Sequence, residues 1–281
     1  MKPISRREFI KLAAGGILTA GLGTPLYAHL VERRWLRTDQ VTLSFDDLPA
    51  DLQSFRILHF SDVHLGYHYG VRDLERLVEN INEHTYDMLC FTGDLIENAP
   101  DLLEASIPIL SRLNAPYGKV AVLGNHDYWQ APDEVADALS QAGFQVLRND
   151  AHRIQVGDAT VAFVGLEDAM HAVPDIQAAM AATQPDDFII VLVHEPDYAD
   201  VYADDSSLVR LQLSGHSHGG QIRLPLIGHL ITPPLGSRYV DRVNHQRGLT
   251  IYTNRGVGTT GVPFRLFCRP ELSRIQLAQQ R

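Results

Sequence analysis

The sequence predicts an α/β domain with helices outside a sheet, and three observations support this. From residue 41 onward, short β-branched or apolar runs alternate with segments of helical periodicity. Several runs, such as FIIVLV at 188–193, are apolar throughout, which is typical of strands covered on both faces. The sequence contains no internal repeat and no low-complexity segment, so we expect one folded domain.

Nine segments have the composition of strands, and four between them have helical periodicity. The predicted strands are 41–45, 55–60, 87–91, 119–123, 160–165, 188–193, 209–214, 249–253 and 272–277. The predicted helices are 71–84, 100–112, 132–142 and 174–183. We divide the chain into residues 1–38, a targeting segment or membrane anchor with a basic linker, and residues 39–281, the folded domain.

The charge distribution argues against a nucleic-acid partner. The 281 residues carry a formal charge of -10. Residues 1–38 hold seven Lys or Arg against two acids, so the remainder carries about -15. A body that acidic repels a nucleic-acid backbone, and an anionic substrate needs a local positive charge such as a metal ion. The two cysteines, Cys90 and Cys268, are too few for a disulfide framework or a thiolate zinc site.

The first residues have the pattern of a targeting segment. A basic start is followed by an uncharged stretch, rich in Gly and Ala, that begins at Leu12. SRREFIK, Ser5 to Lys11, resembles a twin-arginine export signal, which carries folded proteins. This resemblance implies the twin-arginine translocase as a partner and an exported protein, in the periplasm or on the outer face of the cytoplasmic membrane.

Whether this segment is removed stays open. Cleavage after Ala28 places Leu26 where a small residue is preferred, so an uncleaved signal that anchors the protein is the alternative. Residues 12–31 are long enough to span a bilayer, although Pro25 and His29 disfavour a permanent membrane helix. The next residues, ERRWLR, either face anionic headgroups at a membrane surface or form a solvated linker.

Polar motifs follow five of the predicted strands directly. These are SDVHLG, TGDLIEN, GNHD, HEPD and GHSHGG. Because ligands bind at the carboxyl ends of the strands in an open sheet, we expect the side chains of these loops to converge. The metal-ligating candidates are Asp62, His64, Asp94, Asn125, His194, His216 and His218.

This set offers three oxygen donors and four imidazoles. It is too large for one zinc ion and too rich in nitrogen for magnesium or calcium. If one carboxylate bridges, seven side chains form two sites of four. The cofactor prediction is therefore two divalent ions of borderline type, such as Mn, Zn, Fe or Co.

DVH, GD, GNHD, the histidine of VHEP and GHSH resemble the five blocks of the calcineurin-like metallophosphoesterases, from about residue 55 to the C-terminus. The resemblance implies a four-layer αββα sandwich with two mixed sheets. It also implies that Asp94 bridges the two metals. The first metal is then held by Asp62, His64, Asp94 and His218, and the second by Asp94, Asn125, His194 and His216.

Two longer stretches indicate which subgroup of the family the chain resembles. SGHSHGGQIRLP and YTNRGVGTTGVPFRLFCRPELSRIQL are similar to bacterial phosphodiesterases of the YaeI/YkuE type, which are membrane-associated or exported by the twin-arginine route. The chain departs from the protein-phosphatase pattern GDxxDRG, because it reads GDLIEN, with Glu97 at the second aspartate. A phosphoprotein substrate is therefore disfavoured.

The predicted mechanism is attack on phosphorus by a hydroxide that bridges two cations. His126, adjacent to a ligand, is the predicted general acid. Glu97 is predicted to orient that imidazole and keep it protonated; Asp127 is the second candidate for this role, or else a turn or cap residue. Arg255 and Arg265 flank RGVGTTG and either contact a substrate phosphate or form surface salt bridges.

The leading functional hypothesis is a phosphodiesterase of the cell envelope, acting on a phosphodiester or pyrophosphate that includes lipid-linked candidates. One alternative is a membrane-associated UDP-2,3-diacylglucosamine pyrophosphatase of lipid A synthesis, which requires the domain on the cytoplasmic side. The other is a non-catalytic scaffold, which a complete ligand set disfavours.

Overall fold

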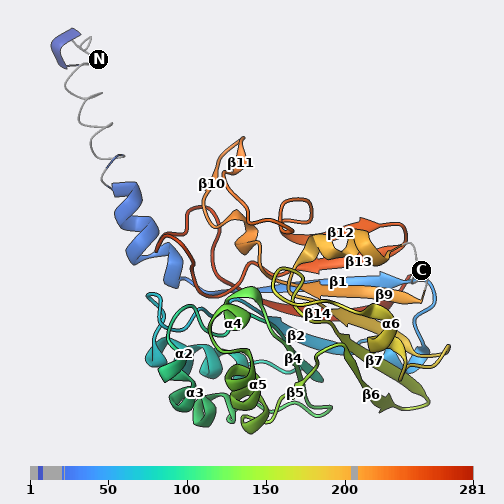
Figure 1. The fold of residues 1–281 in the computed structure, drawn as a ribbon. Helices are drawn as coiled ribbons and strands as arrows, with labels where there is room; N and C mark the ends of the chain where they lie inside the picture. Colours follow the sequence, from blue (N-terminus) through green and yellow to red (C-terminus); the bar gives the residue numbers. More distant parts are fainter. Residues whose placement is uncertain (1–5, 9–20, 22, 204–207, 281) are drawn as a thin grey trace.

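Two mixed sheets pack face to face, and helices cover both outer faces, in this computed structural model (Figure 1). The structure describes residues 6–8, 21, 23–203 and 208–280. Each large sheet has six strands. The predicted four-layer αββα sandwich is confirmed.

The first sheet has the order β1-β14-β2-β3-β4-β5. Strands β2 to β5 run parallel, whereas β14 is antiparallel to β2 and parallel to β1. Its outer face is covered by α2, Val71–Asn82, α3, Leu103–Leu110, and α5, Pro132–Gln141. The strands are β1, Arg37–Phe45, β2, Arg56–Phe60, β3, Met88–Thr92, β4, Lys119–Val122, β5, Gln145–Val146, and β14, Glu271–Gln279.

The second sheet has the order β12-β13-β9-β8-β7-β6. Its four central strands run parallel, and the two edge strands are antiparallel to their neighbours. Short helices α6, Ile176–Met180, and α7, Ala199–Tyr202, pack on its outer face. The strands are β6, Asp150–Val156, β7, Ala159–Gly165, β8, Phe188–Leu192, β9, Val209–Ser214, β12, Arg242–Gln246, and β13, Leu249–Thr253.

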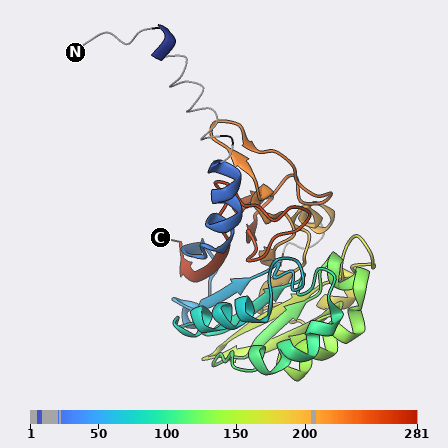
Figure 2. The ribbon, with the colours of Figure 1, turned by 90° about the vertical axis from the view of Figure 1, so that its left-hand side faces the viewer.

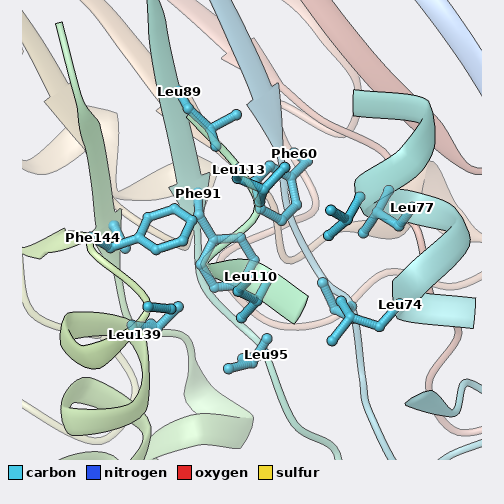
Figure 3. Close-up of a cluster of buried hydrophobic side chains, with 14 of the residues drawn as sticks. Phe60, Leu74, Leu77, Leu89, Phe91, Leu95, Leu110, Leu113, Leu139 and Phe144 are labelled. Carbon is cyan, nitrogen blue, oxygen red and sulfur yellow. The ribbon is translucent and has the colours of Figure 1, made fainter. Parts of the chain in front are cut away.

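The strand side chains alternate between two cores. Along β2, Ile57 packs between the sheets, whereas Leu58 and Phe60 face the helices. Figure 3 shows Phe60 and Phe91 from neighbouring strands packed against Leu74 and Leu77 of α2. Because both faces of the central strands are buried, their sequences are continuously apolar, which is why they could be predicted.

All nine predicted strands are present, and the four predicted helical segments contain α2, α3, α5 and α6. The prediction omitted short or half-exposed elements: β5, β6, β12, α7, the helix α4, Asn125–Gln130, and the hairpin β10, Arg223–Leu224, with β11, Gly228–His229. Two-residue strands and six-residue helices carry too little periodicity for recognition.

The residues before β1 pack on the domain. Residues 23–30 are helical and a 3-10 turn follows at Glu32–Arg34. Glu32 is buried and accepts a hydrogen bond from the backbone N–H of Cys268 at 2.8 Å. The predicted linker therefore contributes buried charges to the fold. Within the described ranges, no helix combines the length and apolar character needed to cross a membrane. Most of SRREFIK and residues 12–20 lie outside the described residues.

Candidate metal centre

The seven predicted ligands converge at one edge of the two sheets. Asp62 and His64 follow β2, Asp94 follows β3, and Asn125 begins α4 after β4. His194 follows β8 of the second sheet, and the two histidines of GHSH follow β9. None of the seven residues is more than 6% exposed.

The backbone at this edge is held in a rarely used conformation. Five of the seven residues have a left-handed φ, which non-glycine residues rarely adopt and which costs about 1 kcal/mol or more each. The five φ angles are 53° at Asp62, 51° at His64, 58° at Asp94, 67° at His216 and 51° at His218. Strain concentrated at one edge is typical of a functional site, because the surrounding fold must impose it.

The first cluster of donor atoms comprises one carboxylate and two imidazoles. Asp62 Oδ1 lies 3.2 Å from His218 Nε2 and 3.8 Å from His64 Nε2, and the two Nε2 atoms are 2.9 Å apart. Asp94 Oδ2 lies 3.6 Å from His64 Nε2. Donor atoms at these separations can all reach one cation at ordinary coordination distances of about 2.0 to 2.2 Å.

The second cluster shares Asp94 with the first. Asp94 Oδ2 lies 3.1 Å from His194 Nε2, and the ring of His216 lies 5.0 Å from that of His194. Asn125 Oδ1 is buried and has no hydrogen-bond partner. Buried polar atoms are almost always satisfied, so this atom fits the role of a cation ligand.

In two of the imidazoles, a hydrogen bond at one ring nitrogen determines that the other nitrogen is available to a metal. His194 Nδ1 lies 2.6 Å from the carbonyl of Thr92, so Nδ1 donates there and Nε2 is free for a metal. His216 Nε2 lies 2.8 Å from the carbonyl of Pro234, which leaves Nδ1 as its free atom. The histidines of GHSH diverge, since the ring of His218 lies beside His64 and that of His216 beside His194.

The electrostatics of the cluster favour positive charge. Burial raises the pKa of Asp62 and Asp94, but the neighbouring histidines outweigh it and hold both carboxyls ionised. Burial lowers the pKa of His64, yet hydrogen bonds to Asp62 and Glu97 raise it to about 10. The negative field that stabilises a proton on this ring also stabilises a divalent cation. The donor set thus fits borderline cations.

Glu97 contacts two histidines at once. Its Oε2 lies 2.6 Å from His64 Nδ1 and 3.1 Å from His126 Nδ1, and its Oε1 accepts a hydrogen bond from the Thr260 hydroxyl at 3.0 Å. Burial raises the pKa of Glu97. The hydrogen bond to His64 and the charge of that ring lower the pKa by more, so this carboxylate is ionised. Sequence reasoning paired Glu97 with His126 and missed its contact with His64.

Asp127 contacts backbone groups instead of the imidazole of His126. Its two carboxylate oxygens accept hydrogen bonds from the N–H groups of Asp94, Leu95, Ile96 and Gly124, at 2.9 to 3.2 Å. It thereby caps α4 and fixes the loop that carries Asp94. This arrangement matches the cap-residue alternative of the sequence analysis.

The two arginines at the ends of the segment 255–265 make different contacts. Arg265 is fully buried, so the expected surface salt bridge is wrong for this residue. Its guanidinium donates to the carbonyls of Arg255, Gly256, Gly258 and Cys268, and Nη2 lies 3.2 Å from His218 Nδ1. Arg255 is mostly buried and pairs with Asp241. A guanidinium was expected at the surface because arginine is seldom buried.

Replacing Arg265 with methionine should weaken the first metal cluster. The carbonyls of Gly256 and Gly258 lose their buried donor, and backbone N–H groups of this loop hold the chain at Asp62. We expect elemental analysis to show metal loss and thermal unfolding to shift to lower temperature. Arg269→Met, which removes a half-buried guanidinium stacked on Trp35, is the control and should retain the metal. Wild-type metal content in Arg265→Met would contradict this role.

Two glycines allow the backbone to approach the carboxylates. A Cβ at Gly215 would lie 2.3 Å from Asp62 Oδ2, and one at Gly124 would lie 2.3 Å from Asp94 Oδ1. Any side chain there would displace a ligand. The glycines of GNHD and GHSH therefore make room for the metal ligands themselves.

A pocket of about 400 Å³ opens above the cluster. Asp94, Asn125, His126 and His216 line its floor, together with His218. Apolar side chains complete its wall: Ile222, Leu230, Ile231 and Val262. The pocket thus places polar groups beside an apolar surface.

The chain is similar in sequence to known metallophosphoesterases. A family model described as calcineurin-like phosphoesterase matches residues 55–220. The metallophosphoesterase YkuE of Bacillus subtilis is 39% identical, with 97% of each chain covered. The phosphodiesterase YaeI of Escherichia coli is 31% identical, with 98% of this chain and 99% of that protein covered.

More distant similarities concern parts of larger proteins. A Danio rerio transmembrane protein with metallophosphoesterase domain is 29% identical over 85% of this chain and 56% of its own length. Among solved structures, the sulfate thiohydrolase SoxB of Thermus thermophilus has a TM-score of 0.50 at 14% identity, covering 75% of this chain and 53% of that one. The match to SoxB shows a similar fold.

Proposed function

Since the chain belongs to the calcineurin-like phosphoesterase family, whose members hydrolyse phosphoric esters, we propose that it is a dinuclear metal-dependent phosphodiesterase. The observation that carries the proposal is the convergence of seven buried ligand side chains beside His126. A near full-length relative named as a phosphodiesterase supports the diester class.

The ligand assignment follows the two clusters. Asp62, His64, Asp94 and His218 would hold one cation, and Asp94, Asn125, His194 and His216 the other. Two divalent cations, when bound, supply an activated water as nucleophile and positive charge for the phosphoryl oxygens. Mn, Zn and Fe all suit this donor mixture.

His126 is proposed to protonate the leaving oxygen. It lies at the pocket floor with Nδ1 directed at Glu97, which leaves Nε2 for the substrate. Glu97 orients the ring of His126, and its second contact, with His64, joins the proposed acid to the metal cluster. Asp127 is left out of the proposed chemistry, because its oxygens serve backbone N–H groups.

Glu97→Gln should lower activity about 10- to 100-fold, the usual effect of removing a group that orients a metal ligand. Without the carboxylate, His126 loses the group that orients its ring, so the loss should be larger on an alkyl diester than on a p-nitrophenyl diester, whose leaving group needs no proton. Steady-state kinetics with both diesters measure this, since a merely structural defect lowers both activities equally. Glu167→Gln, at a carboxylate paired with Arg148, is the control. Equal losses on the two diesters would contradict the role of Glu97.

Turnover of bis-p-nitrophenyl phosphate by the purified protein with Mn or Zn tests the proposed function. Comparison with a phosphomonoester, a UDP-lipid and a phospholipid or teichoic acid fragment then defines the substrate class. Absence of hydrolysis of every ester in the presence of each metal would overturn the proposal. Less than one metal ion per chain in the same preparation would favour the non-catalytic scaffold.

We further propose that the enzyme acts at the cell envelope, on the outer side. The twin-arginine pattern of SRREFIK supports export, and a relative named as a transmembrane protein supports membrane association. The competing proposal, a UDP-2,3-diacylglucosamine pyrophosphatase, requires a cytoplasmic domain. A topology reporter fused to the C-terminus separates the two, because a periplasmic signal excludes the pyrophosphatase and a cytoplasmic signal excludes export.

A further inference from the structure

The β10–β11 hairpin carries a concentration of exposed apolar side chains. Leu226 is fully exposed in its turn and Ile227 is 71% exposed. Leu230 and Ile231, just after β11, are 51% and 81% exposed. Single apolar residues are common on protein surfaces, but four within six positions form a patch that marks an interaction site.

A second apolar surface adjoins the hairpin. Leu26 and Leu30 of the N-terminal helix are about half or more exposed. Hydrogen bonds join this helix and the residues just before the hairpin to the same segment, 260–265. His29 Nδ1 donates to the Pro263 carbonyl, and Gln221 Nε2 donates to the Val262 carbonyl. Figures 1 and 2 both show the helix and the hairpin projecting from the same side of the body. We call these surfaces together the apolar edge: Leu26, Leu30, Leu226, Ile227, Leu230, Ile231 and Val262.

Arginines lie at the base of this edge. Residues 211–270 contain seven arginines and one aspartate. Of these arginines, Arg265 is buried, and four others pair with Asp39, Asp200 or Asp241. Arg34 and Trp35 are exposed at the base of the helix, where Arg269 stacks on the Trp35 ring at 4.0 Å. Arginine and tryptophan beside exposed aliphatic residues are typical of a surface that meets anionic headgroups.

We propose that the apolar edge docks on a bilayer containing anionic phospholipids, with Leu226 and Ile227 inserted at the boundary of the acyl chains. The exposed Arg34 and Trp35 beside aliphatic side chains favour a lipid surface. So does the uncharged run from Leu12 to Ala28, which leads into the same edge.

Docking in this way would turn the mouth of the pocket toward the membrane surface. Leu230, Ile231 and Val262 belong both to the apolar edge and to the pocket wall, and His126 lies on the floor. The pocket would then open at headgroup level, where it would receive a phosphodiester attached to an apolar tail. This substrate class rests on the proposed function, whereas the docking itself does not.

Site-specific labelling of the full chain tests the docking. Cys90 and Cys268 are buried, so an exposed cysteine introduced by Ile227→Cys can be labelled selectively with an environment-sensitive NBD probe. On vesicles of phosphatidylcholine with about 30% phosphatidylglycerol, we expect emission at shorter wavelength and quenching by lipids with spin-labelled acyl chains. The matched control is Val201→Cys in α7, an exposed apolar position outside the edge, whose probe should stay in water.

Two results would overturn the docking. In one, the chain binds vesicles while the Ile227→Cys probe stays in water, which assigns binding to the N-terminal segment alone. In the other, the chain does not bind vesicles and the probe responds only to a protein partner. A probe that enters the bilayer in a protein that hydrolyses no diester would support docking and refute the proposed function.

Activity measurements test whether the mouth of the pocket faces the membrane. The double variant Leu226→Asp with Ile227→Asp leaves the pocket lining unchanged. It should hydrolyse bis-p-nitrophenyl phosphate as the wild type does. It should cleave a phospholipid diester in vesicles about tenfold or more slowly, since both inserted apolar side chains are lost. Equal loss on both substrates, or wild-type cleavage in vesicles, would contradict the inferred orientation.

Discussion

The Asp94→Asn variant is expected to lose about a thousandfold in kcat/KM for a phosphodiester, the effect of several kcal/mol of charge stabilisation. Asp94 Oδ2 lies between the clusters, 3.6 Å from His64 Nε2 and 3.1 Å from His194 Nε2, so its charge would serve both cations. Asparagine removes this charge but keeps an Oδ1 acceptor for the backbone N–H of His126. The variant should therefore fold and lose metal.

Kinetics with bis-p-nitrophenyl phosphate and elemental analysis of the same sample check this expectation. Asp87→Asn removes a carboxylate that pairs with Arg56 away from the cluster, and it should keep both metal and activity. Wild-type metal content together with wild-type turnover in Asp94→Asn would show that Asp94 does not bridge.

The His126→Ala variant is expected to retain its metal and lose about 10²- to 10⁴-fold in activity, the usual contribution of general acid catalysis. The loss should depend on the leaving group. An alkoxide needs a proton in the transition state, whereas p-nitrophenolate is stable without one. The variant should therefore lose more activity on an alkyl diester than on a p-nitrophenyl diester.

Steady-state kinetics with the two diesters measure this difference. His171→Ala is the control, because His171 is an exposed histidine that stacks on Trp129, next to His126. It should behave as the wild type does. Equal losses on both leaving groups, or loss of metal in His126→Ala, would assign His126 to binding instead of proton transfer.

The central strands and the convergence at their ends could be predicted for one physical reason. Strands such as β8 are buried on both faces, and their sequences are therefore unbroken apolar runs. The polar residue that ends each run is easy to recognise. Parallel strands bring these ends to one edge. His194 at the end of β8 and Asp94 at the end of β3 could thus be placed together although they lie on different sheets.

Contacts between loops were beyond sequence reasoning. Glu97 reaches His64 because an isolated bridge pairs Leu65 with Ile96, and no local pattern encodes that pairing. The burial of Arg265 depends on carbonyls that the loop turns inward, and this loop geometry has no periodicity. Helix α4 begins at Asn125 within a motif that has the composition of a turn, so Asp127 acts as its cap.

Metal stoichiometry decides between a dinuclear centre and its alternatives, because seven side chains that form two sites with a shared carboxylate should hold two ions. The purified full chain, reconstituted with Mn or Zn and freed of excess ion, should contain about two ions per chain by elemental analysis. The same sample should hydrolyse bis-p-nitrophenyl phosphate and lose that activity with a chelator. Retention of one ion or none under saturating metal, with or without turnover, would contradict a dinuclear centre.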